Sequence, residues 1–171
     1  MFNLPLQTRL LTALAALALL LPACDDSDDD NGDEPGPSGL APDTLAPGTY
    51  DSPLTLMDDP DRPVDYHVPG DISFQAGSNL TIEAGTVVEF ASGAYWLFRE
   101  SSEFHFNGTE ADSIYLQGKD PVAGYWCGIQ NKSTNVTNNM DHTNLLHAGN
   151  DEDNEAKTAL YLADEAQVAL T

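Results

Sequence analysis

Positive charge is scarce in this sequence. Six Lys and Arg residues face 28 Asp and Glu residues, which gives a formal net charge of -22 at pH 7. Binding the phosphates of nucleic acid requires clustered Lys and Arg side chains, so nucleic acid is excluded as a partner class. A surface this acidic favours solubility in salt and repels other polyanions.

Long apolar runs are also missing. The most extended one, LLTALAALALLL at residues 10–21, has 12 residues, whereas a helix that spans a bilayer needs roughly 20. The run follows Arg9, which gives the amino-terminal segment before it a single positively charged side chain. A short apolar run behind such a start is typical of a secretory signal peptide, which we predict for residues 1–23.

Leu21, Pro22, Ala23 and Cys24 follow the apolar run and resemble the lipobox of bacterial lipoproteins, in which a small residue precedes an obligatory cysteine. The resemblance implies cleavage between Ala23 and Cys24 and a diacylglycerol on the Cys24 sulfur. Acyl chains, at about 0.8 kcal/mol per buried CH₂, hold a soluble domain on a membrane lipid surface without a spanning helix. It also implies a bacterial cell envelope, with the outer membrane or cell surface favoured. Asp25 resembles an inner-membrane retention signal, so the outer leaflet of the inner membrane stays an alternative.

A second interpretation of Cys24 is a disulfide with Cys127, because two cysteines in a secreted chain can pair. We favour lipidation, since Cys24 borders a tract rich in Asp, Pro and Gly that shows no apolar periodicity. Tracts of this composition do not bury enough apolar surface to fold. We therefore predict that residues 24–48 form a disordered acidic tether behind the lipidated cysteine.

From residue 49 on, apolar residues recur in short alternating pairs. Five pairs at i and i+2 start eight residues apart, and three more follow: Ile72/Phe74, Leu80/Ile82, Val88/Phe90, Trp96/Phe98, Phe104/Phe106, Ile114/Leu116, Leu160/Leu162 and Val168/Leu170. Segments in which every second residue is apolar, separated by turns of Gly, Ser and Asn, are predicted to be short, half-buried β-strands.

A longer period distinguishes a stacked repeat from a sandwich. Three strands of eight residues make 24, and the turn at Gly85 and Thr86 recurs 23 residues later at Gly108 and Thr109. A period between 20 and 50 residues indicates a solenoid. Stacking of its coils predicts three apolar columns, with Ile72 under Trp96, Leu80 under Phe104 and Val88 under Ile114.

Two stretches, DYHVPGDISFQAGSNLTIEAGTVVEF (residues 65–90) and GYWCGI (residues 124–129), resemble the right-handed parallel β-helix repeats of bacterial surface lipoproteins. The resemblance implies a pectin-lyase-like fold. We predict an all-β chain, with a right-handed parallel β-helix solenoid of about 23–24 residues per coil over residues 49–171. The signal peptide and the disordered acidic tether precede it. Such folds include polysaccharide-degrading enzymes and adhesive proteins, so fold alone leaves function open.

β-Helix hydrolases place two carboxylates in register on neighbouring coils, where one acts as general acid and the other as base or nucleophile. The sequence shows no such pair. The outward strand positions are Ser73, Thr81, Glu89, Leu97, His105 and Tyr115. Glu110 and Asp112 fall in a loop, and the NTD, DD and GHG elements of polygalacturonase-like enzymes are missing. We predict no catalytic residue and no cofactor.

Three further patterns bear on a site. Asp141, His142 and His147 lack the spacing of a metal centre, so we predict solvated turns and no metal ion. Cys127 lies in an apolar strand and is predicted to be a buried small side chain. The Asn-rich region 131–154 is predicted to form coil corners.

AYWLF at residues 94–98 is apolar on both faces. If Trp96 and Phe98 point inward, Tyr95 and Leu97 point outward. Exposed aromatic side chains stack on sugar rings or anchor partners, and the alternative is that this single pair lies under a loop. Tyr95 and Leu97 are therefore the predicted ligand contacts.

The favoured hypothesis is a membrane-anchored cell-envelope lipoprotein whose non-catalytic β-helix presents a binding or adhesive surface to a polysaccharide or an envelope protein. The alternative is a partial or degraded β-helix polysaccharide lyase or glycoside hydrolase. The last apolar pair, Val168/Leu170, is followed by no cap, although solenoids need end caps. We expect either a truncated product or a docking surface, and self-association through this carboxy-terminal coil is the hypothesis.

Overall fold

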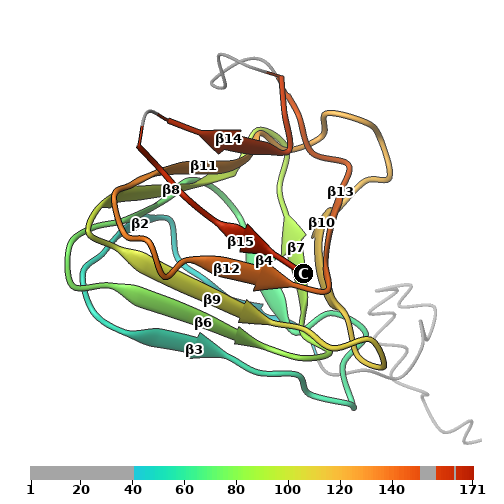
Figure 1. Ribbon diagram of the computed structural model, residues 1–171. Coiled ribbons are helices and arrows are strands. Elements are labelled where there is room, and N and C mark those ends of the chain that lie inside the picture. Colours follow the sequence, from blue (N-terminus) through green and yellow to red (C-terminus); the bar gives the residue numbers. More distant parts are fainter. Residues whose placement is uncertain (1–40, 151–156, 164) are drawn as a thin grey trace, which may run out of the picture. The chain divides into compact units, whose positions relative to one another are not determined.

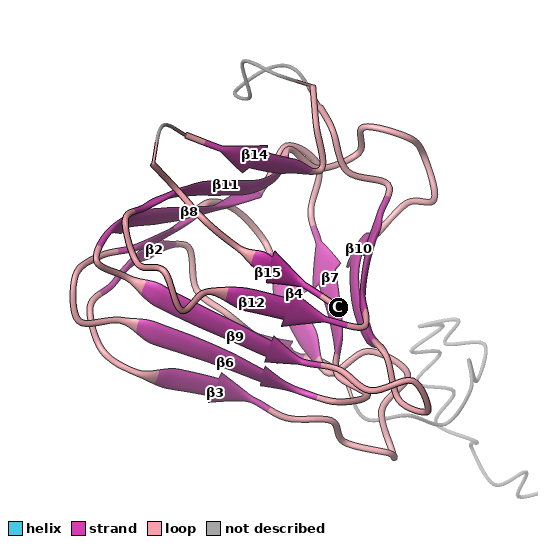
Figure 2. Cartoon of the chain, in the orientation of Figure 1, coloured by secondary structure: helices cyan, strands magenta, loops and turns pink. Residues whose placement is uncertain are grey.

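The computed structural model describes residues 41–150, 157–163 and 165–171, and this part is all β (Figures 1 and 2). It contains no helix long and apolar enough to cross a membrane. The strands are β1 (Asp43–Thr44), β2 (Gly48–Tyr50), β3 (Leu54–Leu56), β4 (Tyr66–Val68), β5 (Ile72–Phe74), β6 (Asn79–Glu83), β7 (Val87–Phe90), β8 (Tyr95–Glu100), β9 (Glu103–Asn107), β10 (Ile114–Gly118), β11 (Gly128–Ser133), β12 (Asn139–Asp141), β13 (Thr143–Leu146), β14 (Leu160–Leu162) and β15 (Ala169–Leu170).

Every third strand joins the same sheet. Sheet A has the order β1-β4-β7-β10-β13, sheet B β2-β5-β8-β11-β14 and sheet C β3-β6-β9-β12-β15. Every strand pairing within them is parallel, so each coil contributes one strand to each sheet. Five coils of three strands therefore stack into a parallel β-helix, and the predicted fold is confirmed.

Alternation of burial along the strands explains how the sequence builds this core. In β5, β7 and β9 the apolar members of each pair are buried and the residues between them are half-buried. The inward side chains of successive coils then stack on each other. Phe74 and Phe98 lie parallel with ring centroids 4.6 Å apart, and Phe90 stacks on Trp126 at 3.9 Å. Rings at these separations add dispersion and quadrupole attraction to the apolar burial.

Two of the three predicted columns are confirmed. Ile72 pairs with Trp96 and Leu80 pairs with Phe104. The third prediction is wrong, because Val88 pairs with Leu116 and not with Ile114. The loop after β9 spans residues 108–113, whereas residues 84–86 form the corresponding turn one coil earlier, and the pairing partner of Val88 consequently lies two residues beyond Ile114. A shift of two keeps the same face inward, so the core is preserved.

The coils lengthen along the chain. Ile72 and its partner Trp96 in the next coil are 24 residues apart, as predicted. From the third coil to the fourth the separation is larger, since Phe104 donates its N–H to the side chain of Asn138, 34 residues further along the chain. At the other end, Asp43 of β1 pairs with Tyr66, so strand pairing begins before the predicted start at residue 49. Added length sits in the loops because the strands must stay in register.

The turn residues singled out in the sequence meet at one corner of the solenoid. Gly85 and Thr109 both donate their backbone N–H to the carbonyl of Asp112, at 3.2 and 3.0 Å. The corner between sheets C and A is thus built by stacked Gly-Thr turns. The predicted signal peptide (1–23), the lipidated Cys24 and the tether up to residue 40 lie outside the described residues.

Candidate functional site

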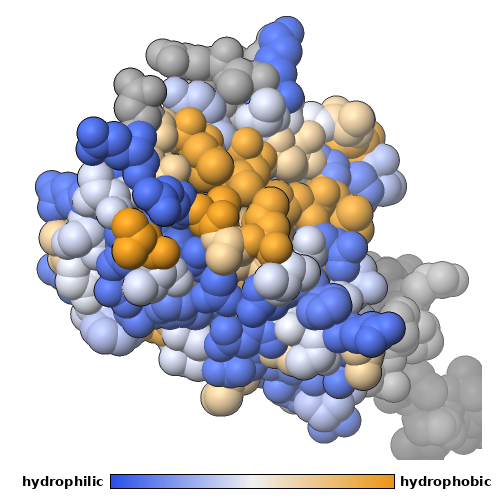
Figure 3. Space-filling model, viewed as in Figure 1, coloured by the Kyte–Doolittle hydropathy of each residue, from blue (hydrophilic) through white to orange (hydrophobic). Residues whose placement is uncertain are grey.

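The outer face of sheet C carries a line of polar side chains linked by hydrogen bonds and by one contact between Glu103 and His105, which we call the polar ladder. It crosses β6, β9 and β12 and takes one residue from the loop before β12. Its members are Asn79, Thr81, Glu103, His105, Asn135, Asn139 and Asp141. They occupy outward positions because the alternate residues of the same strands, such as Phe104 and Phe106, fill the core. Figure 3 shows hydrophilic surface over this part of sheet C.

Glu103 joins three side chains at the centre of the ladder. Asn79 donates to its Oε2 at 3.3 Å, and Asn135 donates to its Oε1 at 2.7 Å. His105 Nε2 lies 3.5 Å from the same Oε2. The carboxylate is 37% exposed, so solvent and ligands still reach it. Glu103 is thus fixed in orientation while keeping acceptor sites open, since a carboxylate offers about four lone-pair positions.

Asn139 determines the tautomer of His105. Its amide nitrogen donates to Phe106 O at 3.4 Å and to Asp141 Oδ2 at 3.1 Å, so its Oδ1 is the atom that faces the imidazole. His105 Nδ1 lies 2.7 Å from that oxygen and must carry the hydrogen. The ring thus lies between Asn139 at Nδ1 and the Glu103 carboxylate, 3.5 Å from Nε2.

The order of the side chains along the ladder bears on what it can bind. The carboxylates of Glu103 and Asp141 lie on either side of the His105–Asn139 pair. Amide donors and carboxylate acceptors therefore alternate along a preorganised face. Sugar hydroxyls both donate and accept hydrogen bonds, and they match such a face.

The ladder was only partly visible in the sequence. His105 was identified as outward-facing, and the same alternation in EFHFN also places Glu103 and Asn107 outward. The prediction of coil corners for region 131–154 is wrong for Asn139, which lies in β12. It is also wrong for Asn131, which lies buried in β11.

The predicted ligand contacts on sheet B do not form an exposed pair. Trp96 and Phe98 point into the core, as predicted. Leu97 is only 4% exposed, however, so the prediction of an exposed Leu97 is wrong. Its neighbour in register, Gln130, is buried too, which shows that the outer face of sheet B is covered there. Tyr95 is half-buried.

The remaining candidates lie in turns or in the core. His142 and His147 both have positive φ, 40° and 63°, and flank β13, in agreement with the predicted turns, whereas Asp141 lies in β12, where the predicted turn is wrong. Cys127 is buried as predicted, with its Sγ 3.1 Å from the carbonyl oxygen of Gly93. Within the described part of the chain no group of three or more His, Cys, Asp or Glu side chains is placed to hold a metal ion.

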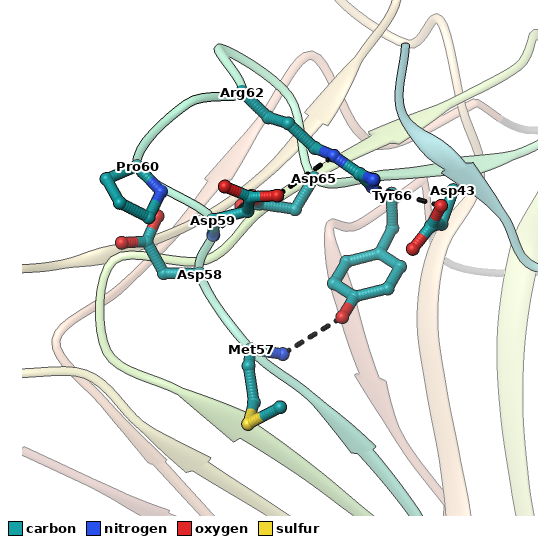
Figure 4. A pocket seen from close by; sticks show the side chains of 8 residues that line it. All are labelled: Asp43, Met57, Asp58, Asp59, Pro60, Arg62, Asp65 and Tyr66. Atoms are coloured by element: carbon teal, nitrogen blue, oxygen red, sulfur yellow. Dashed lines mark hydrogen bonds and ion pairs between the residues drawn. The ribbon is translucent and has the colours of Figure 1, made fainter. Parts of the chain in front are cut away.

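A cavity of about 290 Å³ lies between the first two coils (Figure 4). It is lined by Asp43, Met57, Asp58, Asp59, Pro60, Arg62, Asp65 and Tyr66. Most of its polar groups already bind one another. Arg62 lies 3.0 Å from Asp43 Oδ1 through Nη1, and its Nε lies 3.1 Å from Asp59 Oδ2 without the alignment of a hydrogen bond.

Asp65 is the buried centre of this cluster. Its Oδ1 accepts the backbone N–H of Asp59 at 2.8 Å, and its Oδ2 accepts that of Val87 at 2.7 Å. The hydroxyl of Tyr66 accepts the N–H of Met57 at 3.1 Å. The side chains therefore tie the loop after β3 to the neighbouring coils, and we assign the cavity a structural role.

Asp58, an exposed residue of this rim, gives a pH-dependent prediction. Desolvation raises the pKa of its carboxyl, and the nearby carboxylates of Asp65, Asp112 and Asp59 raise it further. A raised pKa contributes stability below the ordinary Asp pKa of about 3.9 that is lost as pH rises through the folded-state value. We expect Asp58→Asn to raise the urea midpoint slightly at neutral pH and to leave it unchanged near pH 3.

The control is Asp51→Asn at another exposed acidic position. It should change the midpoint at neither pH. Equal midpoints for Asp58→Asn and the wild type at neutral pH would contradict the repulsion inferred at this rim.

Comparison with protein-family models, with curated proteins and with solved structures finds no match for this chain.

Proposed function

We propose that this protein is a lipid-anchored cell-envelope lipoprotein whose β-helix binds neutral polysaccharide through the polar ladder without cleaving it. The observation that carries the proposal is the line of oriented amide, imidazole and carboxylate groups on the outer face of sheet C. Side chains that are already oriented lose less conformational entropy when a ligand binds.

Charge favours a neutral ligand over an acidic one. The chain carries a net charge of -22, and the ladder itself presents the carboxylates of Glu103 and Asp141. An anionic polysaccharide would bring further negative charge to this surface, and the repulsion would slow its approach. Neutral glycans offer hydroxyl groups without that cost.

The first test is retention of the purified full chain on immobilised polysaccharides, with a neutral β-glucan, an α-glucan and a mannan set against polygalacturonate. We expect retention on at least one neutral polymer and none on polygalacturonate. The released sugars are assayed at the same time. New reducing ends or unsaturated products would support the rival proposal of a partial or degraded lyase or hydrolase.

The membrane anchor gives a separate prediction. Cys24 follows an apolar run and precedes an acidic tract, the order expected of a lipidated new amino terminus. We expect Cys24→Ala to abolish acylation and to release the protein from the membrane fraction, because the acyl chains on Cys24 are the proposed anchor. Intact mass and membrane partitioning measure both effects.

Cys127→Ala is the matched control for Cys24→Ala. It leaves the lipobox intact, and the protein should remain acylated and membrane-bound. Unchanged mass and partitioning of Cys24→Ala would contradict the anchor. Density-gradient separation of inner and outer membranes then locates the wild-type protein, for which we propose the outer membrane or cell surface.

A further inference from the structure

Two hydrogen-bond acceptors lie side by side at the centre of the polar ladder. Glu103 and His105 are two residues apart on β9, so both side chains project from the outer face of sheet C. β9 pairs with β6 on one side and with β12 on the other, so this centre lies within the stack of coils. The two side chains are 37% and 26% exposed, which leaves both within reach of a ligand.

The donors around this centre are already engaged. Asn79 and Asn135 each donate an amide hydrogen to a carboxylate oxygen of Glu103. The Nδ1–H of His105 is directed to the amide oxygen of Asn139. These hydrogens therefore satisfy acceptors of the ladder itself.

The acceptors at the centre, in contrast, keep free lone pairs. Each Glu103 oxygen receives one amide hydrogen and can accept two. His105 Nε2 is the unprotonated ring nitrogen, because Nδ1 carries the hydrogen, and among the described residues no group donates to it. Nε2 lies 3.5 Å from Glu103 Oε2, and two acceptors have no hydrogen to share. The pair therefore combines adjacent lone pairs with a negative charge.

The chemical group that fits this pair carries more than one hydrogen. A hydroxyl has a single hydrogen and donates to one acceptor at a time, whereas a primary ammonium group has three donors and no acceptor. Because the two acceptor atoms are 3.5 Å apart, one nitrogen can lie within about 3 Å of both. Its charge is also attracted to the carboxylate, and hydrogen bonds of charged groups are about twice as strong as neutral ones.

The surrounding charge favours the same ligand. Glu83 in β6 and Asp141 in β12 place further carboxylates on the outer face of sheet C, on the strands that flank β9. The described strands of this sheet contain neither Lys nor Arg. The whole chain carries a net charge of -22. A ligand with positive charge is drawn to such a surface.

We infer that the polysaccharide bound by the ladder carries free amino groups on its sugar units, and that one of them lies between Glu103 and His105. This inference rests on the proposed glycan-binding function and names its ligand class. Neutral glycans bind, and the same backbone with amino groups binds more tightly. Glu103 supplies the charge, and Asn139 fixes the tautomer that keeps Nε2 of His105 an acceptor.

Calorimetric titration of the purified full chain in detergent with three β-1,4-linked tetrasaccharides tests the inference. They differ only at C2 of each sugar, which carries a hydroxyl in cellotetraose, an acetamido group in the N-acetylglucosamine tetramer and an amino group in the glucosamine tetramer. At pH 7 and low salt we expect the glucosamine tetramer to bind at least about tenfold more tightly than the other two, since it alone adds hydrogen bonds between charged groups. Raising the salt from about 0.05 M to about 0.5 M should reduce this preference, because salt screens the attraction.

Two charge-matched variants locate the effect. Glu103→Gln removes the charge and keeps one carbonyl oxygen, and it should largely abolish the preference for the glucosamine tetramer. Glu83→Gln removes the same charge from an exposed position of the same face, and it should keep the preference. Unchanged far-ultraviolet circular dichroism shows that both variants are folded.

The outcomes separate this inference from the proposed function. Equal affinity of the wild type for the glucosamine tetramer and cellotetraose would overturn the inference and leave glycan binding in place. A preference that survives Glu103→Gln, or that Glu83→Gln abolishes equally, would overturn it too, since general attraction to an acidic surface would then explain the result. If none of the three tetrasaccharides binds, the inference is wrong, and retention on the immobilised neutral polymers decides the proposed function separately.

Discussion

Replacement of Asp65 by alanine is expected to lower the free energy of unfolding by about 3–5 kcal/mol, since each hydrogen bond to a charged group contributes about 1.5–3 kcal/mol. The carboxylate of Asp65 is buried and accepts two backbone N–H groups, one from Asp59 and one from Val87. Alanine leaves both donors without their acceptor in a buried place. Urea unfolding of the full chain, monitored by tryptophan fluorescence, measures the change.

Two matched variants distinguish this effect from a general loss of charge. Asp65→Asn keeps one carbonyl oxygen and should lose roughly half as much, because one of the two donors can still be satisfied. Asp51→Ala at an exposed position should stay within about 0.5 kcal/mol of the wild type. A loss below about 1 kcal/mol in Asp65→Ala would contradict the structural role of the cluster.

Gly128→Ala is the second change with a large expected effect. Gly128 has a φ of 97°, and a Cβ at this position would lie 2.5 Å from the carbonyl oxygen of Ala159 and 3.0 Å from that of Thr158. Both are backbone atoms of the segment that leads into β14, so the last coil would have to move. We expect a loss of about 3 kcal/mol or more, from backbone strain together with overpacking.

Gly93→Ala separates strain from the close approach. Gly93 also has a positive φ, 75°, but a Cβ there meets nothing within 4 Å. This variant should lose only about 1 kcal/mol, the usual cost of an L side chain in the left-handed region. If both glycine variants lose the same amount, the approach of the Ala159 carbonyl does not explain Gly128. Hydrogen exchange of β14 amides gives a second readout, since Gly128→Ala should speed it selectively.

The solenoid could be predicted from the sequence because its early coils repeat regularly. Apolar residues two apart fix which face of a strand is buried, and the equal eight-residue spacing of the apolar pairs then fixes the register, as in the columns Ile72–Trp96 and Leu80–Phe104. The prediction failed where a loop changed length, at Val88 and Leu116. Local alternation specifies strands, whereas register across a longer loop depends on how that loop folds.

The polar ladder shows the same limit at the level of the site. Asn135 binds Glu103 from 32 residues away and Asn139 binds His105 from 34 residues away, in a coil ten residues longer than the predicted 24. A fixed period therefore could not bring these asparagines onto β9. Leu97 was missed for a different reason. Alternation predicts which way a side chain points but not whether something covers it.

The most direct test of glycan binding by the ladder is the affinity of the full chain for the neutral polysaccharide that retains it, measured beside His105→Ala/Asn139→Ala. Gln117→Ala on the outer face of sheet A, a half-buried polar position, is the control. We expect the double variant to bind at least about tenfold more weakly, since each lost hydrogen bond costs about 0.5–1.5 kcal/mol, with the affinity of the control unchanged and with both variants folded by far-ultraviolet circular dichroism. Equal affinity of the double variant and the wild type would contradict the polar ladder as the binding surface.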